Sequence, residues 1–241
     1  MPVHVNRHQA ERVAVLELDW ERENRFHPDF VAEIMEVLDQ LEDDGDVGAL
    51  VFTGRDPKFF CNGLDLAWVM AHVNQPEEVL GSMYKVNGLF KRVTLYPKPT
   101  IAALNGHTFG AGVFLAAHMD FRLMREDRGW VCMPESDIDI PLLPGMIAIC
   151  QAVLGPKGFR HMYYTGRRYT GPEAVDLGFA ESCHPRDELL SAAIELGAHL
   201  APKKTRTYAE MKRRIRAEVA RILDEEDPPL FAATLSFPLQ A

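Results

Sequence analysis

Residues 105–118 combine a glycine-bearing turn with the start of an apolar helix, and this combination could stabilise negative charge on an oxygen atom. The segment Gly110-Ala111-Gly112 permits a close approach of backbone or ligand, and residues 113–118 carry almost no polar side chain. The first N–H groups of a helix lack partners within the helix and carry partial positive charge. The turn therefore suits an oxygen that becomes an oxyanion, although tight strand-to-helix packing explains the same glycines.

Strands and helices alternate around this turn. Apolar runs bounded by turn residues predict strands at residues 13–18, 49–53, 100–104, 121–124 and 129–133, and residues 58–65 are predicted to form a short extended run into a turn. Apolar residues at helical spacing predict helices at residues 30–41, 66–73, 76–90, 113–118 and 147–154. This alternation predicts an α/β fold, and from Gly158 onward the chain is predicted to be mostly helical.

Composition excludes several classes of protein. The 241 residues are 47% hydrophobic and 25% charged, which predicts one main globular domain. The net charge of -9 does not favour nucleic acid or an anionic membrane surface as a partner. We find no apolar run of the length that a secretory signal or a membrane span needs, so we expect a cytoplasmic protein.

The cysteines and histidines suggest few alternatives. The four cysteines are scattered, which predicts neither a disulfide framework nor a zinc site, and His107 with His118 lacks the acidic cluster of a metal site. We therefore expect no metal. The spacing of Gly106, Gly110 and Gly112 does not fit a dinucleotide-binding loop. Cys61 with His107 as its base stays open as a minor nucleophilic alternative.

Three segments together resemble one family. They are Phe60-Cys-Asn-Gly-Leu-Asp-Leu66, Asn105-Gly-His-Thr-Phe-Gly-Ala-Gly112 and Tyr164-Thr-Gly-Arg-Arg-Tyr-Thr-Gly-Pro-Glu-Ala-Val-Asp-Leu-Gly178. In this order and spacing they resemble the crotonase superfamily, the enoyl-CoA hydratase and isomerase proteins. The resemblance implies an α/β spiral of repeated β-β-α units, with an acyl-CoA-binding core over residues 1–185 and a helical trimerisation region over residues 186–241. It also implies a homotrimer or a dimer of trimers.

The resemblance further implies an acyl-CoA thioester as the ligand, with coenzyme A as part of the substrate and no separate cofactor. In the family, two backbone N–H groups hold the thioester carbonyl, and the alignment of the segments places them at Asn62 and Ala111. An enolate formed beside a thioester carries its charge mainly on that oxygen, so two fixed donors stabilise it. The implied substrate-binding residues are Arg25, Lys58, Cys61, Asn62, Gly63, Leu64, Asp65, Phe109, Gly110, Ala111, Phe114 and Leu143.

The acids decide which reaction is expected. Hydratases of the family use two glutamates, and this chain has Phe114 at the first position and Glu135 at the second. One carboxylate suits an isomerase, because a single base can remove a proton from one carbon and return it to another. Asp137 and Asp139 are rival acids, and Glu135 could instead serve as a capping carboxylate.

The leading interpretation is an enoyl-CoA isomerase in which Glu135 moves the proton. The alternatives are a hydratase or another lyase or hydrolase of the superfamily, and a non-catalytic acyl-CoA-binding protein. The basic residues of the C-terminal region are expected to be solvated, and Leu142, Leu143 and Met146 are expected to line an acyl-chain site. The apolar tail, with Phe231, Leu235 and Phe237, is expected to dock on this subunit or on a neighbour.

Overall fold

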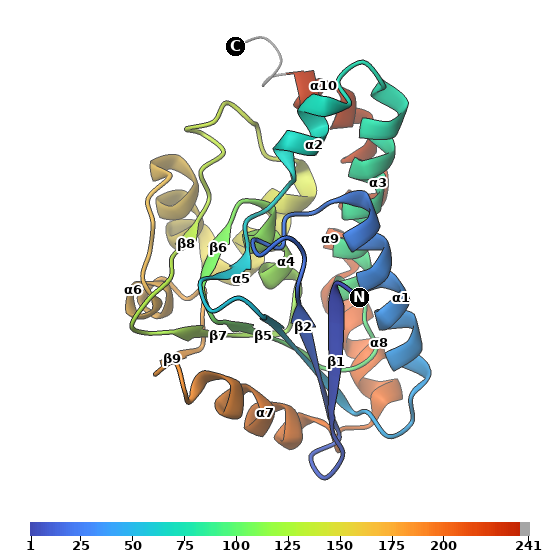
Figure 1. Ribbon diagram of the computed structural model, residues 1–241, viewed down its shortest axis with the longest axis vertical. Coiled ribbons are helices and arrows are strands. Elements are labelled where there is room, and N and C mark those ends of the chain that lie inside the picture. The colour runs from blue at the N-terminus through green and yellow to red at the C-terminus, as the bar shows by residue number, and fades with distance from the viewer. Residues whose placement is uncertain (237–241) are drawn as a thin grey trace.

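A twisted six-stranded sheet forms the centre of the computed structural model, which describes residues 1–236 (Figure 1). Its strands, in spatial order, are β1 (Val3–His8), β2 (Val13–Leu18), β3 (Ala49–Gly54), β5 (Thr100–Leu104), β7 (Phe121–Arg125) and β9 (Ser182–His184). Only the β1–β2 pair is antiparallel, and the other neighbours in this sheet pair in parallel. The middle strands are buried on both faces, which explains their unbroken apolar sequences.

A second sheet contains three short parallel strands, in the order β4 (Phe59–Cys61), β6 (His107–Phe109) and β8 (Val131–Cys132). Along the chain, each of these strands comes directly after a strand of the large sheet: β4 follows β3, β6 follows β5 and β8 follows β7. A helix comes next after β4 and after β6. The predicted repetition of β-β-α units is therefore confirmed.

Helices cover both faces of the large sheet. In chain order they are α1 (Pro28–Asp43), α2 (Leu66–Ala71), α3 (Pro76–Thr94), α4 (Ala111–His118), α5 (Pro144–Thr165, kinked at Gly155), α6 (Gly171–Asp176), α7 (Leu189–Leu200), α8 (Thr205–Ile215), α9 (Ala217–Glu225) and α10 (Phe231–Ser236), with a 3-10 turn at Pro228–Leu230. The larger hydrophobic cluster joins one face of the sheet to α1, α3, α4 and α5. On the other face, α7 packs over β2, β3 and β5.

The predicted strands and helices are present, with three additions. β1 and β6 occur where no strand was predicted, and β9 interrupts the region that was predicted to be helical. The tail docks on its own subunit at Phe231, which is fully buried with its ring centroid 5.0 Å from that of Tyr84. The side chain of Leu235 and all of Phe237 lie outside the described residues. Within residues 1–236, no helix combines the length and the apolar character that crossing a bilayer requires.

Candidate active site

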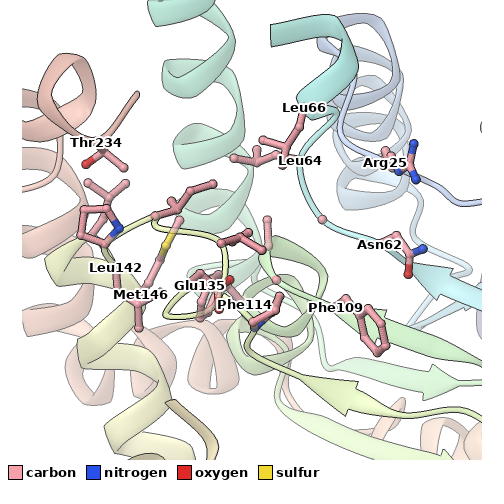
Figure 2. Close-up of a pocket in the computed structure, with 18 of the residues that line it drawn as sticks. Arg25, Asn62, Leu64, Leu66, Phe109, Phe114, Glu135, Leu142, Met146 and Thr234 are labelled. Atoms are coloured by element: carbon pink, nitrogen blue, oxygen red, sulfur yellow. The ribbon is translucent and has the colours of Figure 1, made fainter. Parts of the chain in front are cut away.

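The site lies where the three strands of the small sheet end. Because β4, β6 and β8 are parallel, their carboxyl ends meet at one edge, and each strand continues directly into the wall of one pocket. β4 leads to Asn62 and Leu64, β6 leads to the Gly110 turn, and β8 leads to Glu135. The pocket has a volume of about 380 Å³ (Figure 2). Three segments that are distant in sequence are therefore brought together at one pocket.

Ala111 presents a free N–H group at the start of α4. The preceding residue, Gly110, has φ 54° and ψ -125°, and no side chain of the described residues caps the helix. The N–H of Gly110 donates to the Cys132 carbonyl over 3.0 Å, which fixes the turn on β8. Within the described part of the chain, the Ala111 N–H has no hydrogen-bond partner. A ligand oxygen in the pocket can take this position.

Asn62 does not offer the second donor. Its N–H donates to the Glu23 carbonyl over 3.0 Å, and its side-chain Nδ2 donates to the Glu23 carboxylate over 3.0 Å. Because the backbone N–H is already paired within the protein, the expectation that it holds a ligand oxygen is corrected. Asn62 still lines the pocket.

Leu64 carries the N–H that fits this role. The left-handed Gly63, with φ 83°, turns the chain between Asn62 and Leu64. Phe26 brackets the turn, since its N–H donates to the Gly63 carbonyl over 2.8 Å and its carbonyl accepts from Asp65. The Leu64 N–H has no partner among residues 1–236, and Leu64 lines the pocket. The sequence offered one signal for Leu64, namely the glycine that precedes it, because such a glycine allows the chain to reverse the direction of the next N–H.

Glu135 is the one carboxylic acid among the described lining residues. The residue is 6% exposed, and Oε2 is buried without a hydrogen-bond partner in the part of the chain that the structure describes. A Cβ placed on Gly110 would lie 3.3 Å from Oε1, so the carboxylate lies beside the turn that carries Ala111. Burial disfavours the charged form and raises the pKa of Glu135 to about 7, against a smaller opposing effect of its own backbone N–H. The group can therefore exchange a proton near neutral pH.

The rival acids point elsewhere. Asp137 and Asp139 are exposed, and neither lines the pocket. The Asp137 carboxylate lies against Gly166 at the end of α5. Asp139 has φ 56°, a left-handed conformation that glycine adopts most easily. The geometry favours Glu135 over both.

Phe114 lies one turn into α4, on the wall shared with Glu135. It is 1% exposed and belongs to the main hydrophobic cluster. The position that would hold a second carboxylate in a two-acid site is therefore occupied by an aromatic ring. The remaining described wall is predominantly apolar, and it is lined by Leu66, Ala67, Met83, Pro134, Ile138, Ile140, Pro141, Leu142, Leu143, Met146 and Thr234.

The other predicted binding residues divide into two groups. Arg25, Gly63, Phe109 and Leu143 line the pocket, and the Arg25 guanidinium pairs with the Glu23 carboxylate. Three do not line it: Lys58, Cys61 and Asp65.

Each of these three has another contact. The Lys58 ammonium lies 4.9 Å from the centre of the Phe59 ring. Asp65 caps α2 by accepting from the Trp68 N–H over 3.0 Å. Cys61 is fully buried and donates to the Asn24 carbonyl over 3.0 Å.

The cysteine alternative fails on this geometry. Burial raises the pKa of the Cys61 thiol to about 12, so the thiolate that a nucleophile needs is disfavoured. His107, the proposed base, is buried against the Trp130 ring with a centroid distance of 4.8 Å. Burial and the nearby cations lower the pKa of His107. Neither group belongs to the pocket wall.

Comparison with known proteins gives a consistent result. A family model described as enoyl-CoA hydratase/isomerase matches residues 8–227. The peroxisomal enoyl-CoA delta isomerase 2 of Arabidopsis thaliana is 34% identical over 221 residues, which covers 88% of this chain and 92% of that protein. Enoyl-CoA delta isomerase 3 of the same plant is 35% identical over 219 residues, covering 87% of this chain and 91% of its own length.

Solved structures share the fold. Human mitochondrial delta3-delta2-enoyl-CoA isomerase superposes with a TM-score of 0.93 at 21% identity, over 98% of this chain and 92% of that one. An enoyl-CoA hydratase from Mycobacterium marinum superposes with a TM-score of 0.87 at 23% identity, over 98% of this chain and all of that one (100%). These likenesses confirm the crotonase architecture of the strands and helices described above. On the match of the family model and on the relatives, this chain belongs to the enoyl-CoA hydratase/isomerase family of the crotonase superfamily.

Proposed function

We propose that this protein is an enoyl-CoA isomerase, which moves a carbon–carbon double bond of an acyl-CoA thioester from the 3,4 to the 2,3 position. The observation that carries the proposal is one buried carboxyl group, Glu135, in an apolar pocket that Leu64 and Ala111 also line, each with an N–H group that has no partner among residues 1–236. The names of the two plant relatives support the same activity.

In the first step, ionised Glu135 takes a proton from the carbon next to the thioester carbonyl. The electron pair of the broken C–H bond forms a dienolate, whose negative charge lies mainly on the carbonyl oxygen. The Leu64 and Ala111 N–H groups donate to that oxygen. Preformed donors of this kind stabilise the developing charge, and losing one typically costs on the order of 3 kcal/mol.

In the second step, the protonated Glu135 returns the proton to the fourth carbon of the acyl chain. The double bond is then conjugated with the carbonyl, and no atom has been gained or lost. The raised pKa of Glu135 serves both steps, since a group with a pKa near the working pH can accept and release a proton with similar ease. The proposed chemistry transfers no electrons to a cofactor, so we propose that none besides the coenzyme A of the substrate is needed.

Phe114 is the reason that we place hydration second. Water addition in a two-acid site needs one group to activate water and another to supply a proton, and here the ring of Phe114 occupies one of those places. The ring also keeps the wall beside Glu135 apolar, which disfavours an ordered water. Glu135 alone suits proton transfer between two carbons.

Assembly and compartment are part of the proposal. We propose that the chains form trimers or pairs of trimers, and the exposed Met211 and Ile215 of α8 support an apolar surface available to a second chain. Light scattering on the purified protein measures the mass of the assembly.

We keep the cytoplasm as the proposed compartment, although two plant relatives are named as peroxisomal. Microscopy of the full chain with a fluorescent tag distinguishes the two.

The experiment that tests the function is turnover of 3-enoyl-CoA and 2-enoyl-CoA thioesters by the protein and by its Glu135→Gln variant. We expect migration of the double bond by the first and almost none by the second. Water addition by both proteins would overturn the isomerase assignment. Binding of acyl-CoA without conversion, unchanged in the variant, would favour the non-catalytic alternative.

A further inference from the structure

One part of the pocket wall comes from the C-terminal helix α10. Thr234 of α10 lines the pocket, and its side chain is 8% exposed. Figure 2 shows Thr234 on the side of the pocket opposite Arg25 and Asn62, with Glu135 between them. α10 lies more than ninety residues after Glu135 in the chain, so this wall is supplied by a part of the protein remote from the three segments that define the chemistry.

Contacts with α3 and α5 hold this helix in place. The fully buried Phe231 packs edge-to-face on Tyr84 of α3, with ring centroids 5.0 Å apart. Asp227, which is 1% exposed and precedes the 3-10 turn, accepts from the Gly145 N–H at the start of α5 over 2.8 Å. The Asn87 amide of α3 donates to the Leu223 carbonyl over 2.6 Å. The end wall is thus anchored on the two helices that also supply the side walls.

The course of a bound acyl chain follows from these positions. The thioester carbonyl lies at Leu64 and Ala111 under the proposed function, and the reacting carbons lie beside Glu135. Carbons farther along the chain then run past Met146 of α5 toward Thr234 (Figure 2), in a part of the pocket that Met83 of α3 also lines. The mouth beside Arg25 is left for coenzyme A, which is too large for the pocket interior.

We infer that α10 closes the acyl pocket and that the volume of the Thr234 side chain limits the length of acyl chain that the enzyme accepts. This inference rests on the proposed function, because it uses the thioester position given there. A chain that is one methylene too long must displace the end wall or leave the site. One methylene in a hydrophobic pocket changes the specificity constant by about tenfold or more.

The test is the ratio of kcat/KM for long and short 3-enoyl-CoA substrates, from hexenoyl to tetradecenoyl in two-carbon steps. Thr234→Ala is expected to raise the long-to-short ratio by about tenfold, and Thr234→Leu to lower it by a similar factor. Thr234→Val has nearly the shape of threonine, so it is expected to retain the wild-type ratio. The matched control is Ala232→Leu, which adds the same kind of bulk on the exposed face of the same helix.

The outcomes separate the inference from the proposed function. An unchanged ratio in both Thr234→Ala and Thr234→Leu would overturn the inference, and so would a shift by Thr234→Val as large as that by Thr234→Ala. If one variant fails to fold by circular dichroism, the other still tests the opposite direction. Calorimetric binding of saturated acyl-CoA thioesters gives the same ratio without turnover. A shifted binding ratio in an inactive protein would support the inference and reject the isomerase, whereas absence of acyl-CoA binding would reject both.

Discussion

The backbone of Gly63 lies directly against the amide of Ala111. A Cβ placed on Gly63 would be 3.0 Å from the Ala111 nitrogen and 2.9 Å from the Phe109 carbonyl oxygen. Gly63 also has φ 83°, which other L-residues rarely adopt. The residue therefore sets the separation of β4 from the start of α4. It also sets the direction of the Leu64 N–H, so one position controls both proposed donors.

Gly63→Ala is expected to reduce kcat/KM about a hundredfold or more, comparable to the loss of one oxyanion donor. The new methyl group must push the Ala111 amide away from its place, and the turn at Gly63 becomes strained. Steady-state kinetics measure the change, with thermal melting as a check on folding. The matched control is Gly88→Ala in α3, where a Cβ meets no atom of the described residues within 4 Å. Wild-type rates in Gly63→Ala would show that these N–H groups do not hold the substrate carbonyl.

Glu135→Gln keeps the size of the side chain and removes its ability to take a proton. We expect kcat for double-bond migration to fall by about a factor of 10² to 10⁴, the range typical of a positioned acid or base. Binding of a saturated acyl-CoA is expected to change little, because the pocket keeps its shape. Asp137→Asn is the control, since that acid is exposed and lies outside the pocket. If Asp137→Asn lowers kcat more than Glu135→Gln does, Glu135 is not the base.

Local sequence predicted the central unit well. The apolar run that became β5, the turn at Gly110 and the buried helix α4 were each predicted, because all three depend on residues that are close together in the chain. β1 was missed, since four of the six residues in its sequence VHVNRH are polar. It lies at the edge of the sheet, where one neighbouring strand suffices, and its pairing with β2 is a tertiary contact.

The identity of the second donor depends on contacts between residues that are distant in sequence. Any of the N–H groups at Asn62, Gly63 and Leu64 could have faced a ligand, judged from the sequence alone. Which N–H group stays free depends on the Glu23 carbonyl, which lies in a loop thirty-nine residues earlier and accepts a hydrogen bond from the Asn62 N–H. It also depends on the left-handed turn at Gly63. In the same way, Thr234 joins the pocket through packing of Phe231 on α3, which no short-range pattern encodes.

The rate of isomerisation is expected to rise with pH through an apparent pKa of about 7 in kcat/KM. Glu135 must be ionised to remove the first proton, and burial raises its pKa to this range. Arg25 is the other ionisable side chain on the described wall, and its guanidinium pairs with the Glu23 carboxylate. A pH series between weakly acidic and weakly basic buffers measures the profile. A limb near the ordinary glutamate pKa, between 4 and 5, would contradict the assignment of a buried base.

Folding stability is expected to depend on pH through the same residue, in the opposite sense. The pKa of Glu135 is about 7 in the folded protein and near the ordinary glutamate value of 4.5 in the unfolded chain, so the folded state binds more protons between these two values. The free energy of unfolding therefore falls as pH rises through this window and then levels off, with a total loss of about 3 kcal/mol. Asp227 adds a decline of its own, because burial raises its pKa to about 6.

The difference in the free energy of unfolding between the wild type and Glu135→Gln isolates the Glu135 contribution. Urea unfolding at several pH values is expected to show the variant gaining stability over the wild type as pH rises from 5 to 8, since glutamine has no charge to bury. A constant difference over that range would mean that Glu135 is not a buried carboxylate without a partner.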